Sequence, residues 1–132
     1  MNTKQFCQLV NTTRDTLRFY DQKGLLIPQR DANNYRAYTV DDQKTFLIIR
    51  NLQLAGLKLN EIEMILNLRE RPINSECHDD TLQFILEKQR EFNHKEIFYK
   101  QLQKTTATMV DSLEHSQSDL EDLINKLGDI NN

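Results

Sequence analysis

Several classes of protein are excluded by what this 132-residue chain contains little of. Its two cysteines, Cys7 and Cys77, lie far apart, which is not the pattern of a disulfide framework. No run approaches the roughly 20 apolar residues that a membrane-spanning helix needs. The first five residues are polar and continue directly into a helical pattern, unlike a secretory signal. We therefore expect a cytoplasmic protein with two thiols and no membrane partner.

The chain also lacks the patterns that carry catalysis. No nucleophile stands at motif spacing from a base, no phosphate-binding loop is present, and no paired metal ligands occur. The acidic pairs Asp41-Asp42 and Asp79-Asp80 are typical of helix N-termini, where the helix dipole favours negative charge. We therefore expect no enzyme, no cofactor and no metal site.

The charge is divided unevenly along the chain. Residues 1–71 hold eleven basic and eight acidic side chains, whereas residues 72–132 hold six and twelve. A mildly basic half joined to an acidic half indicates two different tasks. The basic half is the candidate for contact with a polyanion, although its excess of charge is small.

The most informative stretch is Thr16–Pro28, which places basic and aromatic side chains on a short amphipathic helix. Residues 4–10 form a short helix before it, and Thr13 is a suitable N-cap for the second helix. Gly24 ends that helix in the left-handed conformation. Two short helices joined by a tight turn predict a helix-turn-helix.

A hairpin is expected directly after this pair of helices. Residues 29–38 have no helical period, and Asn33-Asn34 is a turn signal. Two short strands joined there would form a wing. Basic and aromatic side chains surround the turn, which suits a grip on a phosphate backbone. These side chains are Arg30, Tyr35, Arg36 and Tyr38.

The rest of the chain is predicted to be helical. A third helix begins at Thr39, which forms a capping box with Asp42, and ends at Gly56; a fourth follows over residues 59–68. Residues 1–71 thus make one domain, and residues 72–80, with Pro72, make a linker. Residues 81–117 read as one long helix, since 81–113 contain neither proline nor glycine, and residues 118–132 as a short helix and tail.

The long helix is too long for one small domain to cover. Ile85, Phe92 and Tyr99 lie seven residues apart, but polar side chains interrupt the heptad pattern. An antiparallel or short contact between two copies of the chain is therefore expected.

The order and spacing of the motifs in residues 3–70 resemble the MerR family of bacterial transcription regulators. The matching segments are Thr16–Asp21, Gly24–Leu26, Asn34–Thr39, Ile49-Arg50 and Leu54–Gly56. The resemblance implies a mainly α protein, with a winged helix-turn-helix domain and a coiled-coil dimerisation helix. It implies a homodimer on a palindromic operator in double-stranded promoter DNA, which it bends and untwists so that RNA polymerase can use the promoter.

The resemblance also assigns site residues. Arg18 and Tyr20 stand where the family grips phosphates from the recognition helix, and Tyr35, Arg36 and Tyr38 stand where the wing does so. Thr13 begins the recognition helix, and Arg14 and Asp15 are early in it, within reach of base edges. Asp15 replaces a frequent basic residue, and its carboxylate can accept a hydrogen bond from cytosine. Lys58 stands at a position where the family often has a serine that caps the next helix, so that cap is expected to be lost. The side chains of Arg50 and Lys58 are expected on solvated surface and not in contact with DNA.

Sensing and output stay open at the level of sequence. Cys77 is a candidate thiol sensor, a candidate soft-metal ligand together with His78 and a partner chain's His115, or a cysteine without a special role. Cys7 is expected in the core. One alternative to a regulator is an architectural winged-helix protein that bends DNA without a transcriptional effector response. A second is a coiled-coil adaptor that has lost DNA binding and works through its acidic half.

Overall fold

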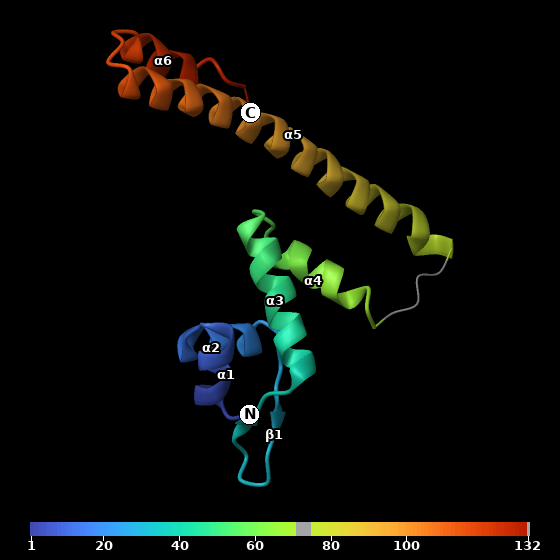
Figure 1. The fold of residues 1–132 in the computed structure, drawn as a ribbon. Coiled ribbons are helices and arrows are strands. Elements are labelled where there is room, and N and C mark those ends of the chain that lie inside the picture. Colours follow the sequence, from blue (N-terminus) through green and yellow to red (C-terminus); the bar gives the residue numbers. More distant parts are fainter. Residues whose placement is uncertain (71–74, 132) are drawn as a thin grey trace. The chain divides into compact units, whose positions relative to one another are not determined.

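The structure is a computed structural model that describes residues 1–70 and 75–131, with side chains for residues 1–70 and 78–131. The chain divides into two compact units, Met1–Ile73 and Asn74–Asn132. The described residues form helices and one two-stranded sheet, which confirms the mainly α prediction (Figure 1). No described helix is long and apolar enough to cross a membrane.

Two short helices open the first unit. Helix α1 spans Thr3–Val10 and starts with a capping box at Asn2. Helix α2 spans Arg14–Gln22, and the Thr13 side chain accepts a hydrogen bond from the Thr16 amide at its N-terminus. This confirms the predicted cap, which satisfies one of the unpaired amides of the first turn. Gly24 follows with φ +73°, a value that glycine adopts at little cost.

The wing follows as a short antiparallel hairpin. Strands β1 (Gln29–Arg30) and β2 (Arg36–Ala37) pair in the register Gln29 with Ala37 and Arg30 with Arg36. The turn needs a left-handed residue, and Asn34 supplies it with φ 63°. The Asp31 carboxylate accepts two backbone amides inside the turn. The predicted wing and its turn are both confirmed.

A second pair of helices packs on the first. Helix α3 spans Val40–Leu54 and begins with the capping box predicted at Thr39. Helix α4 spans Leu59–Asn67 and lies beside α3 (Figure 1). The exposed Lys58 side chain provides no cap, as expected, although Glu61 accepts from the Lys58 amide at 2.9 Å.

Four aromatic rings form the centre of the core in the first unit. Phe6 stacks on Tyr38 with ring centroids 4.4 Å apart and meets Phe46 edge-on at 6.1 Å. Tyr20 lies 5.9 Å from Phe46. These contacts join α1, α2, α3 and the residue that follows β2, so the core fixes the recognition helix and the wing in one frame. The aliphatic part of the same core comprises Val10, Leu17, Leu25, Leu26, Ile49, Leu57, Ile62 and Leu66.

Arg50 ties α3 to the end of α1. Its guanidinium donates to the carbonyl oxygens of Val10 and Asn11, the second at 3.0 Å. It also lies over the Phe46 ring, 4.7 Å from the centroid. Arg50 is therefore only partly exposed, and its side chain is held by backbone carbonyls instead of being freely solvated as expected. A cation at the C-terminal carbonyls of α1 is favoured by the helix dipole and satisfies acceptors that the helix leaves unpaired.

The described residues of the second unit form two helices. Helix α5 spans Ser75–Glu114, a length of about 60 Å at 1.5 Å per residue. It begins six residues before Thr81, so the predicted linker of residues 72–80 is too long by its last six positions. Acidic side chains at the start of a helix favour this earlier beginning. Residues 71–74, with Pro72, lie outside the described part of the chain.

The C-terminal helix folds back on the long one. Helix α6 spans Leu120–Leu127 and packs against α5, burying Leu123. The buried Ser112 hydroxyl hydrogen-bonds the Asp119 carboxylate across the turn. The turn itself contains Ser116 with φ 52°. Helix α5 therefore ends at Glu114, short of the predicted end at residue 117, and the predicted short C-terminal helix packs back on it.

Candidate nucleic-acid interface

The outward face of α2 carries charge, and its inward face is apolar. Leu17 is buried in the core, whereas Arg14, Asp15 and Arg18 are exposed. The side chains of Arg14 and Arg18 lie on one face because residues four apart in a helix are neighbours. A rigid, capped helix thus presents two guanidinium groups to solvent.

A small hollow lies where α2, α1 and the wing meet. Its volume is about 100 Å³. A broader hollow of about 580 Å³ shares Thr3, Arg14 and Arg36 with it and extends over the wing. We call the small one the arginine hollow, and its lining residues are Thr3, Arg14, Leu17, Arg18, Arg36 and Tyr38. The broader hollow is also lined by Asn2, Lys4, Arg30, Asp31 and Tyr35.

The surface formed by the two hollows is positively charged and favours binding of an anion. Five of the side chains that line the two hollows are basic and one is acidic. The acidic one, Asp31, already accepts two backbone amides of the wing turn. The modest positive charge of the first unit is thus gathered at the recognition helix and the wing.

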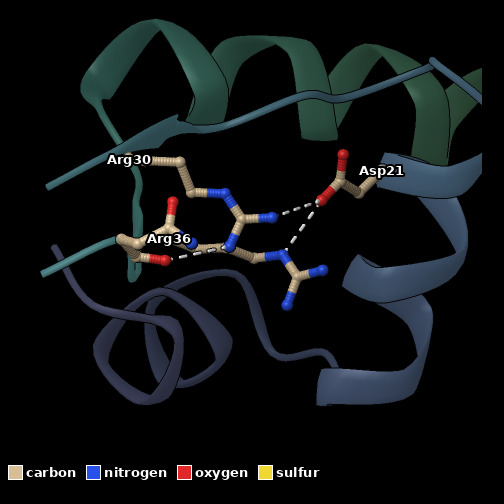
Figure 2. A network of polar contacts seen from close by, with 4 residues as sticks. Asp21, Arg30 and Arg36 are labelled. Carbon is tan, nitrogen blue, oxygen red and sulfur yellow. Dashed lines mark hydrogen bonds and ion pairs between the residues drawn. The ribbon is translucent and has the colours of Figure 1, made fainter.

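An acidic side chain links the recognition helix to the two arginines of the wing (Figure 2). Asp21, at the end of α2, accepts a hydrogen bond from Nε of Arg36 at 3.0 Å and lies 3.6 Å from Nη2 of Arg30. Arg30 also donates to the Asn34 carbonyl at 3.4 Å. The network joins the recognition helix to both strands of the wing.

Tyr20 is placed differently from the sequence prediction. Its side chain is buried, and its hydroxyl donates to Gln53 Oε1 at 2.6 Å. The position falls on the inward face of α2, one turn after Leu17, so the ring fills the core instead of facing the surface. The prediction placed this side chain on the surface, and the structure corrects that placement; its contact with phosphate stays a prediction.

Tyr38 is also buried, with 2% of its surface exposed, although the sequence placed it on the wing surface. Its ring stacks on Phe6, and among the described residues no group pairs with its hydroxyl. Burial raises the pKa of the Tyr38 hydroxyl, and the nearby charge of Arg36 opposes that rise. Tyr38 is thus a core ring whose hydroxyl lies under the basic surface.

The remaining predicted positions are on the surface. The side chain of Tyr35 is 69% exposed at the tip of the wing, and Thr13 lies exposed at the start of α2. Arg36 is only partly exposed because Asp21 holds it. Asp15 has no hydrogen-bond or ion-pair partner among the described residues, so its carboxylate is available in the first turn of α2.

The structure adds Lys4 and Asp21 to the predicted set. Arg30 flanks the predicted turn, so the basic pattern already pointed to it. Lys4 and Asp21 gave no such signal. The contact between Asp21 and Arg36 spans 15 positions, and no local pattern encodes a pairing of that kind.

The cysteines give less support for sensing. Cys7 is partly buried against the core, and burial raises its pKa, which makes it a weaker nucleophile. The side chain of Cys77 lies outside the described residues. Among the side chains that are described, no group of three His, Cys, Asp or Glu residues could hold a metal ion.

Alkaline pH is expected to destabilise the first unit. Burial raises the pKa of Tyr20 and Tyr38 above 10.0 and that of Cys7 above 9.0. The folded state thus holds these protons more tightly than the unfolded state. The resulting stability is complete below about pH 9 and is lost as the pH rises through the raised folded-state values. Urea unfolding at about pH 8 and about pH 10.5 measures the loss.

A double variant provides the control for this pH effect. Replacing both Tyr20 and Tyr38 by phenylalanine removes the two phenol protons and should flatten the alkaline decline. A free energy of unfolding that stays constant or increases above pH 9 in the unsubstituted protein would contradict the assignment of these buried phenols.

Comparison with known proteins identifies the family. Residues 1–68 match the family model described as the MerR HTH family regulatory protein. The chain belongs to the MerR family. It is 34% identical over 73 residues to the HTH-type transcriptional regulator CueR of Vibrio cholerae, which covers 54% of this chain and 52% of that protein. It is 31% identical over 109 residues to the multidrug-efflux transporter 2 regulator of Bacillus subtilis, covering 82% of this chain and 37% of that protein.

Solved structures of MerR proteins share the fold. A putative MerR regulator from Listeria monocytogenes aligns with a TM-score of 0.70 at 18% identity, covering 98% of this chain and 95% of that one. HiNmlR, a MerR regulator lacking the sensor domain and bound to promoter DNA, aligns at 0.64 and 19% identity, covering 93% and 94%. The match spans about half the length of curated relatives such as CueR of Vibrio cholerae. The activities of those whole proteins are therefore not assigned to this chain.

Proposed function

We propose that this MerR-family chain is a homodimeric transcription regulator that binds promoter DNA through α2 and the wing. The observation that carries the proposal is the arginine hollow, where Arg14 and Arg18 from α2 meet Arg36 from the wing. Guanidinium groups that converge from two elements suit a phosphate, which accepts bidentate hydrogen bonds. HiNmlR, which shares the fold, was solved on promoter DNA.

The Tyr38 hydroxyl is the neutral donor of this phosphate site. It is buried and unpaired among the described residues, and its residue lines the arginine hollow. An unsatisfied buried hydroxyl is costly, and such groups persist where a ligand supplies the missing partner. A phosphate oxygen in the hollow would accept this proton after a small movement of the lining side chains.

Base recognition falls to the start of α2. Arg14 and Asp15 occupy its first turn, where a recognition helix meets base edges in the major groove. Arginine pairs well with guanine, and a carboxylate accepts from cytosine N4. Asp15 would be repelled by phosphate, so we assign it to a base edge.

A palindromic operator needs two copies of the DNA-binding site, and we assign the second copy to a second chain in a homodimer. Two half-sites one helical turn apart need two recognition helices related by a two-fold axis. Helix α5 offers the contact, since Ile85, Phe92 and Tyr99 are 42%, 37% and 63% exposed along it. Light scattering at micromolar concentration should give twice the 15.6 kDa chain mass. A monomer at that concentration would contradict the dimer.

Two tyrosine-to-phenylalanine variants test the phosphate site. Tyr38→Phe removes an unpaired buried hydroxyl, so the free energy of unfolding should rise by about 1 kcal/mol while DNA affinity falls about tenfold. Tyr20→Phe removes a hydroxyl that is bonded to Gln53. It should lower the free energy of unfolding by about 1 kcal/mol and leave DNA affinity unchanged.

The two variants control for each other, because the free energy of unfolding should rise for Tyr38→Phe and fall for Tyr20→Phe. Urea unfolding and fluorescence anisotropy with a labelled promoter fragment give the two quantities. Equal DNA affinity of the Tyr38→Phe protein and the unsubstituted protein would remove Tyr38 from the site.

The alternative is an architectural protein that bends DNA and has no transcriptional output. The long helix α5 argues against it, because DNA-bending proteins of that kind are usually short. Transcription in vitro from the promoter of its own gene, with and without the protein, separates the two. Unchanged transcript levels under conditions where the promoter is saturated would favour the architectural role. An effector response, through Cys77 or otherwise, would appear as a change in those levels.

A further inference from the structure

The carboxylate of Asp21 sits where the recognition helix meets both strands of the wing. Its side chain is 17% exposed, and one oxygen serves both contacts, Arg36 at 3.0 Å and Arg30 at 3.6 Å. The side chain of Arg36 is 26% exposed and that of Arg30 is 45% exposed. The three residues come from three elements, so the contact is tertiary and not a helix-surface pair.

The way in which Arg36 is held leaves its outer nitrogens available. Asp21 accepts from Nε, and both Nη groups lie beyond it, on the side away from the carboxylate (Figure 2). No described residue accepts from these two groups. Arg36 also lines the arginine hollow. An arginine fixed through Nε, with its Nη groups unpaired, is preorganised to donate to an anion.

Arg30 is held differently by the same oxygen. The distance of 3.6 Å is longer than a charge-assisted hydrogen bond, and its side chain is more exposed. It lines the broad hollow with Arg36 but not the arginine hollow. A phosphate over the wing can therefore compete with Asp21 for Arg30 at little cost, whereas Arg36 stays bonded.

We propose that Asp21 is a positioning residue for DNA binding. It fixes Arg36 so that its guanidinium can bind one phosphate, and it holds Arg30 only loosely, so that Arg30 can be released to bind a second phosphate. The inference rests on the proposed function and names the group that organises the wing arginines. Fixing a long side chain before binding reduces the conformational entropy lost on binding, which raises affinity without any new contact.

Whether DNA affinity rises or falls when Asp21 is removed distinguishes a positioning role from a simple effect of its charge. Asp21 is a negative charge beside a surface proposed to meet DNA, so its removal should strengthen binding if only net charge mattered. Loss of positioning acts the other way. If Asp21 only stabilised the wing, its replacement would lower the free energy of unfolding and would not change the DNA affinity of the folded protein.

The experiment is a double-mutant cycle on promoter-DNA affinity, measured by anisotropy well below each variant's melting temperature. The variants are Asp21→Ala, Arg36→Ala and the two together. We expect Asp21→Ala to weaken binding about tenfold when Arg36 is present and less than about twofold when Arg36 is absent. If Asp21→Ala is not folded, Asp21→Leu serves the same test, because its side chain also cannot accept from Nε of Arg36.

Asp41→Ala is the matched control for charge. Its carboxylate is 93% exposed at the start of α3, 3.9 Å from Lys44, and it lines neither of the two basic hollows. It removes the same charge and should strengthen binding slightly or leave it unchanged. Asp21→Ala behaving like Asp41→Ala, or losing affinity equally in both Arg36 backgrounds, overturns the inference. An unsubstituted protein that binds no DNA overturns the proposed function and this inference with it.

Discussion

Replacing Arg18 by alanine is expected to weaken promoter-DNA binding by the dimer about 100-fold, without regard to sequence. Arg18 is exposed on α2 and lines the arginine hollow, so each arm of the dimer loses one phosphate contact. Losing one contact per arm should also flatten the slope of log affinity against log salt by about 2. Anisotropy titrations at several salt concentrations, with a promoter fragment and a scrambled one, measure both changes.

Lys44→Ala supplies the matched control for this prediction. Lys44 lies on α3 with a side chain 71% exposed, and it lines neither of the two basic hollows. It removes the same positive charge and should change the affinity only slightly. An Arg18→Ala protein that keeps the affinity and salt slope of the unsubstituted protein would contradict the proposed interface.

Phe6→Ala should have the largest effect on stability, lowering the free energy of unfolding of the first unit by about 4 kcal/mol. Phe6 is fully buried and contacts both Tyr38 and Phe46, so its removal leaves a cavity at the centre of the core. A domain of this size is stable by only about 4 to 10 kcal/mol. Urea unfolding followed by circular dichroism should show the loss, together with the loss of DNA binding near the new melting temperature.

Phe19→Ala is the control for this change. Phe19 lies on α2 with its side chain 38% exposed, so the same substitution creates little cavity. It should cost less than about 1.5 kcal/mol. Similar costs for the two variants would mean that Phe6 does not occupy the centre of the core.

The parts of the fold that depend on local chemistry were predictable from the sequence. The cap at Thr13, the capping box at Thr39 and the left-handed turn at Asn34 all follow from residue type and spacing. Helix α5 began earlier than predicted, at Ser75, because a proline and polar residues before a helix do not say where it starts. The hairpin of α5 and α6 depends on a tertiary contact that periodicity does not reveal.

The site was predictable to the level of its elements but not of each side chain. The basic and aromatic pattern located α2 and the wing. It could not separate Arg18, which faces solvent, from Tyr20, whose hydroxyl is bonded inside the unit. An aromatic residue serves a core or an interface equally well, and only packing decides between them. The role of Asp21 depends on Arg36, 15 positions away, and so had no signature in sequence.

The most direct test of a DNA-binding surface on α2 and the wing is a salt-dependent binding titration of the unsubstituted protein with the DNA that flanks its own gene. Specific binding by a dimer is expected, with an affinity that falls steeply as the salt concentration rises. Two phosphate contacts per arm give a log–log slope of about −4 or steeper. Binding that is absent, or that does not change between low and physiological salt, would contradict the claim that α2 and the wing form a DNA-binding surface.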